Sequence, residues 1–154
     1  MKKLILIAFC LPFTLFAQKK SAKGYGFIGA GLHFIEKTQN VAARLNIGVC
    51  SPNVGIGLDV QYIRDYGVPI LGDFRFISPA IKGKRLTIAA KAGTNVYDKS
   101  LVKGGFVYGG ELGVIFDTSK NGFYISGQYL SMQYKSKITA FKVNDFGVGI
   151  GVKF

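Results

Sequence analysis

Large apolar residues alternate with small or polar residues over most of the chain. The clearest run is the last, residues 144–154, where every second residue is large and apolar and the residues between are glycine or charged. Because successive side chains of a strand point to opposite faces, this run predicts a strand with one apolar and one polar face. The apolar positions of this run are Phe146, Val148, Ile150, Val152 and Phe154.

The same alternation marks seven earlier segments, most of which have the roughly 9–11 residues of a tilted membrane strand. Turn-forming residues separate them, and the total is even, as in bacterial single-chain barrels. We therefore predict an all-β fold, an eight-stranded antiparallel up-and-down transmembrane β-barrel over residues 24–154. The seven segments are residues 24–34, 40–50, 54–64, 68–78, 86–96, 105–116 and 123–134.

The segment at 123–134 departs from the pattern in its second half. Phe123, Ile125 and Tyr129 give one apolar face, but Leu130 and Met132 have the opposite parity. We expect a β-bulge or an early exit from the membrane there.

The composition of the polar face indicates which side of the barrel is inside. A soluble barrel also alternates, with its apolar face inward. Here the polar face is rich in glycine, which weakens a strand unless another group must approach closely. Small residues inside a narrow eight-stranded barrel let its walls fit around a few large side chains, so we expect the apolar face outside. These glycines are Gly48, Gly55, Gly57, Gly93, Gly109, Gly113, Gly147, Gly149 and Gly151.

Four bases and four acids also occupy positions on the polar face. An unpaired buried charge is very costly, so a balanced set predicts ion pairs that fill the lumen. This predicted lumen charge network consists of Arg44, Asp59, Asp73, Arg75, Lys91, Glu111, Asp145 and Lys153.

Outward aromatic residues gather near the strand ends, as in the girdles of membrane barrels. The alternative is that an aromatic-rich β protein places aromatic residues without such order. The residues concerned are Phe34, Tyr62, Phe76, Phe106, Phe116, Phe123 and Phe154.

The N-terminus has the features of a cleaved secretory signal peptide over residues 1–17: a basic start, an apolar stretch and Ala17 before polar residues. Cys10 follows Phe9 rather than a small residue, which argues against a lipoprotein. Residues 18–23 would form a short basic periplasmic tail before the barrel. Cys50 is then the one cysteine of the mature chain, so an internal disulfide is excluded.

These features together resemble the small OmpA/OmpX-type barrels of bacterial outer membranes, in which the closing strand alternates and commonly ends in Phe. The resemblance covers the whole mature chain and implies the outer membrane of a Gram-negative bacterium, with both termini in the periplasm. It also implies that residues 146–154 act as a C-terminal insertion signal for the barrel-assembly machinery. The partners would be outer-membrane lipid, lipopolysaccharide and, for an accessory subunit, a larger outer-membrane complex.

The formal net charge of +12 would suggest nucleic acid for a cytosolic protein. For an exported protein we expect lipid phosphates instead, and we predict no nucleic-acid partner. Lys99, Lys103, Lys135 and Lys137 are candidate lipopolysaccharide contacts on the outer rim. A basic rim that only keeps the turns soluble is the alternative.

We expect no enzyme activity, cofactor or metal site. His33 is the one histidine, and its neighbours Phe34 and Ile35 do not form the His-x-Ser element of lipid A deacylases. We read it as a rim or lumen packing residue. The predicted function is a structural or accessory role in the envelope, with a narrow pore for small solutes or ions as the alternative. Outward Gly72, Gly110 and Gly127 would offer flat patches to a neighbouring protein.

Overall fold

The computed structural model describes residues 23–51, 53–99, 102–117, 122–136 and 138–153. The expected signal peptide, most of the basic tail and Phe154 lie outside these ranges. Within them, no helix is long and apolar enough to cross a membrane. The strands are β1 (Lys23–Ile35), β2 (Thr38–Ser51), β3 (Val54–Ile63), β4 (Val68–Ile77), β5 (Lys84–Val96), β6 (Asp98–Lys99), β7 (Val102–Asp117), β8 (Gly122–Ser136) and β9 (Ala140–Lys153).

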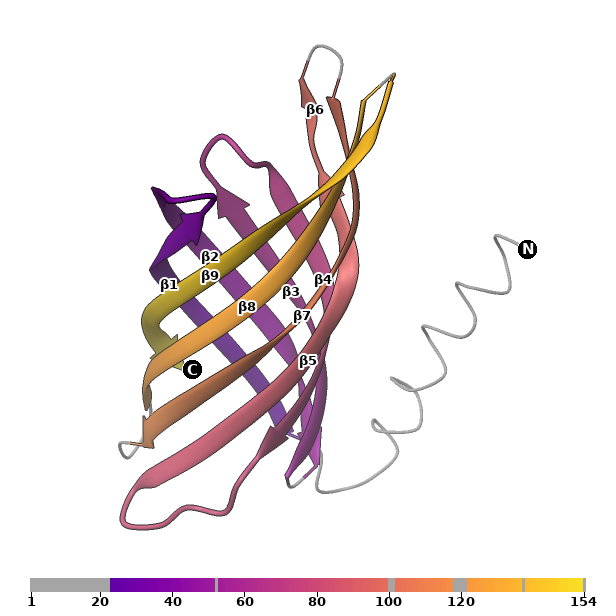
Figure 1. Cartoon of the computed structure of the whole chain (residues 1–154). Helices are drawn as coiled ribbons and strands as arrows, with labels where there is room; N and C mark the ends of the chain where they lie inside the picture. Colours follow the sequence, from indigo (N-terminus) through magenta and orange to yellow (C-terminus); the bar gives the residue numbers. More distant parts are fainter. Residues whose placement is uncertain (1–22, 52, 100–101, 118–121, 137, 154) are drawn as a thin grey trace, which may run out of the picture.

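Every long strand pairs antiparallel with its neighbours along the chain, and the first strand pairs with the last (Figure 1). The β1–β9 pairing runs from Phe27 opposite Lys153 to Ile35 opposite Asp145 and closes the sheet. The fold is thus an eight-stranded antiparallel up-and-down barrel, as predicted, with β6 as a short addition. Closure leaves no open sheet edge along the wall.

The two ends of the barrel differ in shape. We call the end that carries Gly24 and Lys153 the terminal end, and the opposite end, with the Glu36–Lys37 turn, the distal end. At the distal end the β5–β7 and β8–β9 hairpins extend beyond the other strands (Figure 1). The residues between the predicted segments 86–96 and 105–116 do not form only a turn, because β6 pairs with Val102 and Lys103 and continues the hairpin.

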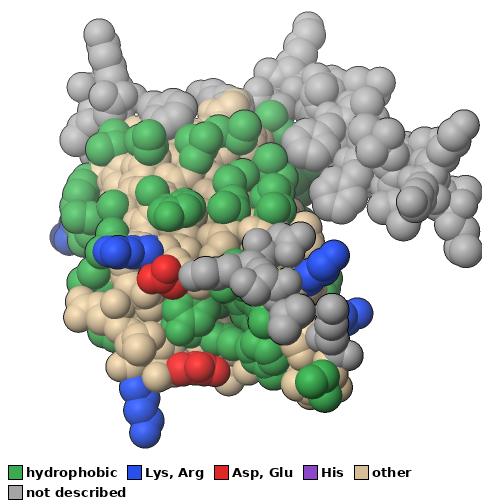
Figure 2. Space-filling view, turned by 90° about the horizontal axis from the view of Figure 1, so that it is seen from above, with side chains coloured by type: hydrophobic (Ala, Val, Ile, Leu, Met, Phe, Trp, Pro, Cys, Tyr) green, Lys and Arg blue, Asp and Glu red, His purple; other side chains and the backbone are tan. Residues whose placement is uncertain are grey.

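Apolar side chains cover the outside of the barrel and polar side chains fill its middle. Leu112 is 63% exposed and Phe146 is 60% exposed, whereas Asp59 and Arg75 on the inner face have no exposure. A soluble barrel has the reverse arrangement. Seen from above, onto the distal end, basic side chains lie at the edges and apolar side chains cover much of the surface between them (Figure 2).

The bulge expected in the segment at 123–134, which lies within β8, is wrong. Strand β8 keeps its parity throughout, and Leu130, Met132 and Tyr134 all point inward and are buried. The irregularity lies on the neighbouring strand, where Gly104 faces Tyr134 but Val107 faces Met132, so β7 holds an extra residue. The side chains of β8 therefore keep alternating between the two faces. Those that point inward in this half of the strand are mostly apolar, so the lumen is apolar there.

Glycines on the inner wall make room for Tyr25, whose ring lies across β2 and β3. A Cβ atom added at Gly48 would lie 2.6 Å from the Tyr25 hydroxyl oxygen, and one at Gly57 would lie 2.8 Å from it. Such approaches are far inside van der Waals contact. The glycines therefore let the wall close around an aromatic side chain, as the sequence analysis expected.

We predict that Gly48→Ala destabilises the barrel by about 1–3 kcal/mol, because the new methyl group must displace Tyr25 or the backbone of β3. Urea unfolding of the protein in detergent micelles measures the change. Ala43→Leu is the matched control on the same strand, since Ala43 points outward, and it should shift stability by less than about 0.5 kcal/mol. Equal stabilities for Gly48→Ala and the wild type would contradict the close packing.

Candidate functional site

Six charged side chains from five strands meet inside the barrel near its mid-height. We call them the central ion cluster. Three are bases and three are carboxylates, so the formal charges balance, and each lies at an inward position of its strand. The members are Arg44 of β2, Asp59 of β3, Asp73 and Arg75 of β4, Lys91 of β5 and Glu111 of β7.

Glu111 is the hub of this cluster because it contacts all three bases. Its carboxylate accepts from Lys91 Nζ at 2.5 Å and lies 3.0 Å from Arg75 Nη1, and it also pairs with Arg44. Asp59 joins two of the same bases, with Arg44 Nε at 2.8 Å and Lys91 Nζ at 2.6 Å. The contacts tie β2, β3, β4, β5 and β7 together across the lumen.

The side chain of Arg75 has no exposure to solvent, and its guanidinium contacts several neighbouring side chains. It donates to Asp73 Oδ2 from Nη2 at 2.8 Å and to the Tyr124 hydroxyl at 3.3 Å. Its guanidinium also lies over the Phe27 ring, 5.1 Å from the centroid. Asn46 donates to the same Asp73 oxygen at 2.5 Å. Such contacts offset part of the desolvation cost of a buried guanidinium.

Two glutamines connect the cluster to the opposite wall. Gln61 donates to Asp59 at 3.0 Å and exchanges hydrogen bonds with Gln128 of β8 at 3.0 and 2.7 Å. Gln128 also accepts from Lys91 Nζ at 3.2 Å. The side-chain amides of Gln61 and Gln128 thus extend the hydrogen-bond network from the central ion cluster to β8.

His33 and Asp145 form a separate buried pair, with His33 Nδ1 2.6 Å from Asp145 Oδ2. Asp145 was predicted as a member of the lumen charge network and His33 as a rim or lumen packing residue, but their contact was not predicted. The two residues lie on β1 and β9, so only the register of the closing strand pair brings them together. Lys153, also expected in the network, lies nearer the terminal end, opposite Phe27 and Gly122.

Apolar layers lie on both sides of the charged level, and the sequence analysis did not predict them. Both lie on the inner face. The distal layer consists of Ile35, Ala42, Ile63, Leu71, Val107, Leu130, Met132, Tyr134 and Val143, with Tyr66, Tyr97 and Val102 packed on it. The terminal layer consists of Tyr25, Phe27, Ile77, Ile115 and Tyr124, with Cys50 packed on it.

A small cavity remains between the central ion cluster and the glycine-rich wall of β1 and β9. Its volume is about 30 Å³, and His33, Ser126 and Gln128 supply polar groups to its lining. That volume suits a water molecule and is far below the roughly 300 Å³ of a small-molecule site. Among the described residues, no group of three or more His, Cys, Asp or Glu side chains is placed to hold a metal ion.

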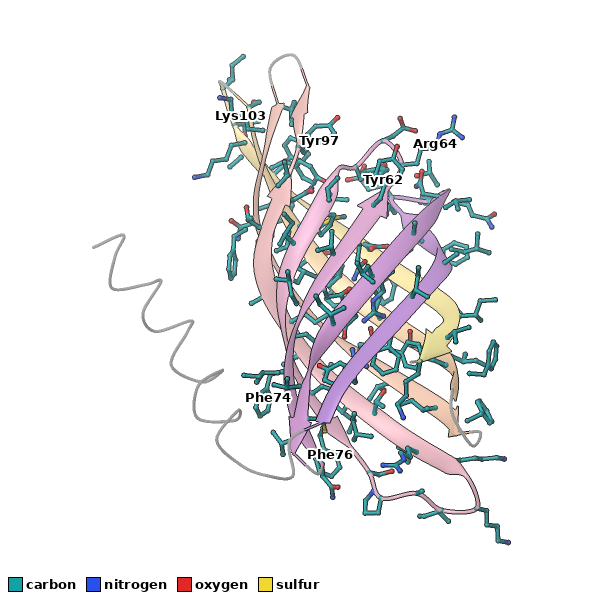
Figure 3. The ribbon with its side chains drawn as sticks, turned by 180° about the vertical axis from the view of Figure 1, so that it is seen from behind. Tyr62, Arg64, Phe74, Phe76, Tyr97 and Lys103 are labelled. Atoms are coloured by element: carbon teal, nitrogen blue, oxygen red, sulfur yellow. The ribbon has the colours of Figure 1, made fainter. Side chains whose placement is uncertain are left out.

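The other predicted site residues lie on the outside. Phe146, Val148, Ile150 and Val152 are exposed along β9, while Phe154 lies outside the described residues. Lys103 lies at the distal end (Figure 3), and it faces Lys135 across β7 and β8. The backbone of Lys99 pairs with Val102, but its side chain and all of Lys137 lie outside the description.

The comparisons with known proteins concern the fold. No protein-family model matches the chain, and no curated protein matches it either. Among solved structures, the chain is similar to Neisserial surface protein A, with a TM-score of 0.68 and 13% sequence identity. The match covers 87% of this chain and 98% of that one. A likeness at this identity establishes a shared barrel architecture.

We predict that Glu111→Gln destabilises the barrel by about 3–5 kcal/mol, because it leaves three buried bases with one fewer carboxylate. Equilibrium unfolding in detergent micelles measures this loss. Asp65→Asn is the matched control, since Asp65 pairs with Arg64 at 3.8 Å and the two side chains are 68% and 77% exposed. It should cost less than about 1 kcal/mol. Equal losses in the two variants would contradict the role of Glu111.

Proposed function

We propose that the protein is an integral outer-membrane barrel with a structural role in the cell envelope. The observation that carries this proposal is the reversal of polarity across the wall, with apolar side chains outside and ion pairs inside. Monomeric soluble proteins rarely expose apolar patches larger than a few hundred Å². A closed barrel also satisfies its backbone hydrogen bonds internally, as lipid requires.

Aromatic side chains support a membrane position along the barrel axis. Tyr62 points outward near the distal end, and Phe74 and Phe76 point outward near the terminal end (Figure 3). Phe34 and Phe106 are exposed towards the distal ends of β1 and β7. Aromatic girdles of membrane barrels lie at the two lipid interfaces. The apolar wall between these two levels would then face the hydrocarbon.

We propose the topology of the small OmpA/OmpX-type barrels, with the terminal end in the periplasm and the distal end outside. The outward apolar face of β9 would serve as the insertion signal read by the barrel-assembly machinery. Lys103 and Lys135 would then meet the phosphates of lipopolysaccharide. These assignments rest on the resemblance of the sequence and on the exposure of the residues concerned.

A closed structural barrel is favoured over a pore because of the contents of the lumen. The central ion cluster fills the mid-level, and the distal and terminal layers lie on either side of it. An ion that crossed the lumen would have to part these layers as well as the ion pairs. We therefore rank the narrow pore second.

We propose no catalytic role. The His33–Asp145 pair resembles two members of a catalytic triad, but both side chains are buried and His33 Nε2 faces Gln128 at 3.5 Å. A substrate would have no room beside it, given the size of the adjacent cavity. The pair is better explained as a clamp between β1 and β9 where the barrel closes.

The test of the proposal is expression of the full chain in a Gram-negative host, followed by membrane fractionation. We expect the protein in the outer-membrane fraction, soluble only with detergent, with different gel migration before and after boiling. In the native organism, deletion should increase sensitivity to bulky antibiotics, and the wild-type gene should restore resistance. Protein that is soluble without detergent would contradict the membrane assignment. Unchanged antibiotic sensitivity after deletion would contradict the structural role.

We further predict that the double variant Lys103→Glu, Lys135→Glu retains less lipopolysaccharide during purification. A lysine near an anionic lipid surface contributes about 1 kcal/mol, so retention should fall by about tenfold or more. Lys82→Glu, Lys84→Glu is the matched control, because both lysines are exposed at the terminal end, in the β4–β5 turn and at the start of β5. Phosphate analysis of the purified protein measures the effect. Equal loss in both double variants, or none in either, would contradict the contact.

A further inference from the structure

We infer that the outer wall formed by β5, β7, β8 and β9 carries a specific binding site for lipid A, the phosphorylated and multiply acylated part of lipopolysaccharide. This inference rests on the proposed membrane location and adds a defined site to it. The site has two parts, an apolar groove for acyl chains and a polar group above it for a phosphate.

The apolar groove lies where two outward positions lack side chains. Gly110 of β7 and Gly127 of β8 form its floor, and its volume is about 620 Å³. A second groove of about 390 Å³ adjoins it and shares Gly127. The walls of the first groove are Ile88, Leu112, Tyr129, Phe146 and Val148, and the second adds Leu86, Val114 and Ile125.

The glycine at the centre of this surface is not required by the barrel itself. A Cβ atom added at Gly127 would meet nothing nearer than the Gly147 carbonyl oxygen at 4.0 Å, in contrast to the tight inner glycine Gly48. Gly110 is tighter, because a Cβ atom there would lie 3.2 Å from the Ala89 carbonyl oxygen, so the open outward position is Gly127. Since glycine weakens a strand, its use here fits a group that approaches from outside.

A polar group interrupts the apolar wall on the distal side of the groove. Tyr108, Ser131 and Asn144 face one another across β7, β8 and β9. Asn144 Oδ1 accepts from the Tyr129 hydroxyl at 3.0 Å. We call Tyr108, Ser131, Asn144 and Lys142 the headgroup cluster.

Lys142 gives the headgroup cluster its positive charge. It is exposed on the outer face of β9, and its Nζ lies 5.8 Å from the centroid of the Tyr108 ring on β7. The ammonium therefore reaches across β8 to the ring of Tyr108. A cation beside hydrogen-bonding groups at a lipid interface is complementary to a phosphate.

The two parts are close enough for one lipid to fill both. Gly110 is the next outward position after Tyr108 on β7, and Phe146 is the next after Asn144 on β9. Two residues of a strand span roughly 7 Å. The cluster lies on the distal side, which is the outer-leaflet side in the proposed topology, and two adjoining grooves suit several acyl chains. These features favour lipid A over a two-chain phospholipid.

The test is native mass spectrometry of the full-length, detergent-folded barrel titrated with hexa-acylated, diphosphorylated lipid A. We expect Gly127→Leu, which fills the groove, and Lys142→Gln, which removes the charge, each to weaken binding by about tenfold. Ala43→Leu on the opposite wall and Lys37→Gln at the same end are the matched controls and should bind as the wild type does.

Each outcome has a distinct meaning. Wild-type affinity in both Gly127→Leu and Lys142→Gln would overturn the site, and so would equal weakening in the controls. Competition by phosphatidylglycerol at the same concentration as lipid A would overturn the choice of ligand. A chain that shows no heat-dependent gel migration in detergent would instead count against the membrane barrel, so the two failures can be told apart.

Discussion

The contact of Glu111 with three buried bases is the interaction on which the rest of this structure depends. An eight-stranded barrel encloses a space only wide enough for side chains. Any charge placed there loses its water and needs partners of opposite sign. Glu111 meets this requirement for Arg44, Arg75 and Lys91 at once, and Asp59 and Asp73 complete a neutral set. The cluster thereby joins five strands through side chains as well as through backbone hydrogen bonds.

The other features of the barrel follow from the central ion cluster. Apolar layers on both sides keep the ion pairs away from solvent, which strengthens their attraction. Inner glycines such as Gly48 and Gly57 let the wall close around Tyr25 in the terminal layer. The charged side chains of the central ion cluster are paired inside the barrel. Leu112, Phe146 and similar apolar side chains point outward, where only a lipid environment suits them. A filled lumen and an apolar outer wall support the proposed structural role.

Much of this architecture could be predicted from the sequence, because strand parity is a local property. Alternation along residues 144–154 correctly assigned Val148 to the outside, and the glycines marked the inside. The alternation was misread at Leu130 and Met132, because apolar residues at inward positions look like a change of face when the partner strands are unknown. The extra residue in β7 and the short pairing of β6 gave no sequence signal. The His33–Asp145 contact depends on the β1–β9 register, which is a long-range property.

Single-channel recording tests most directly the central claim that the lumen is closed. Purified, detergent-folded protein would be inserted into planar lipid bilayers, with a known porin as the positive control and a gel shift on the same sample as proof of folding. We predict no discrete current steps, because the central ion cluster and the two apolar layers fill the lumen. Reproducible stepwise conductance from the folded protein would contradict it and would make a narrow pore the better description.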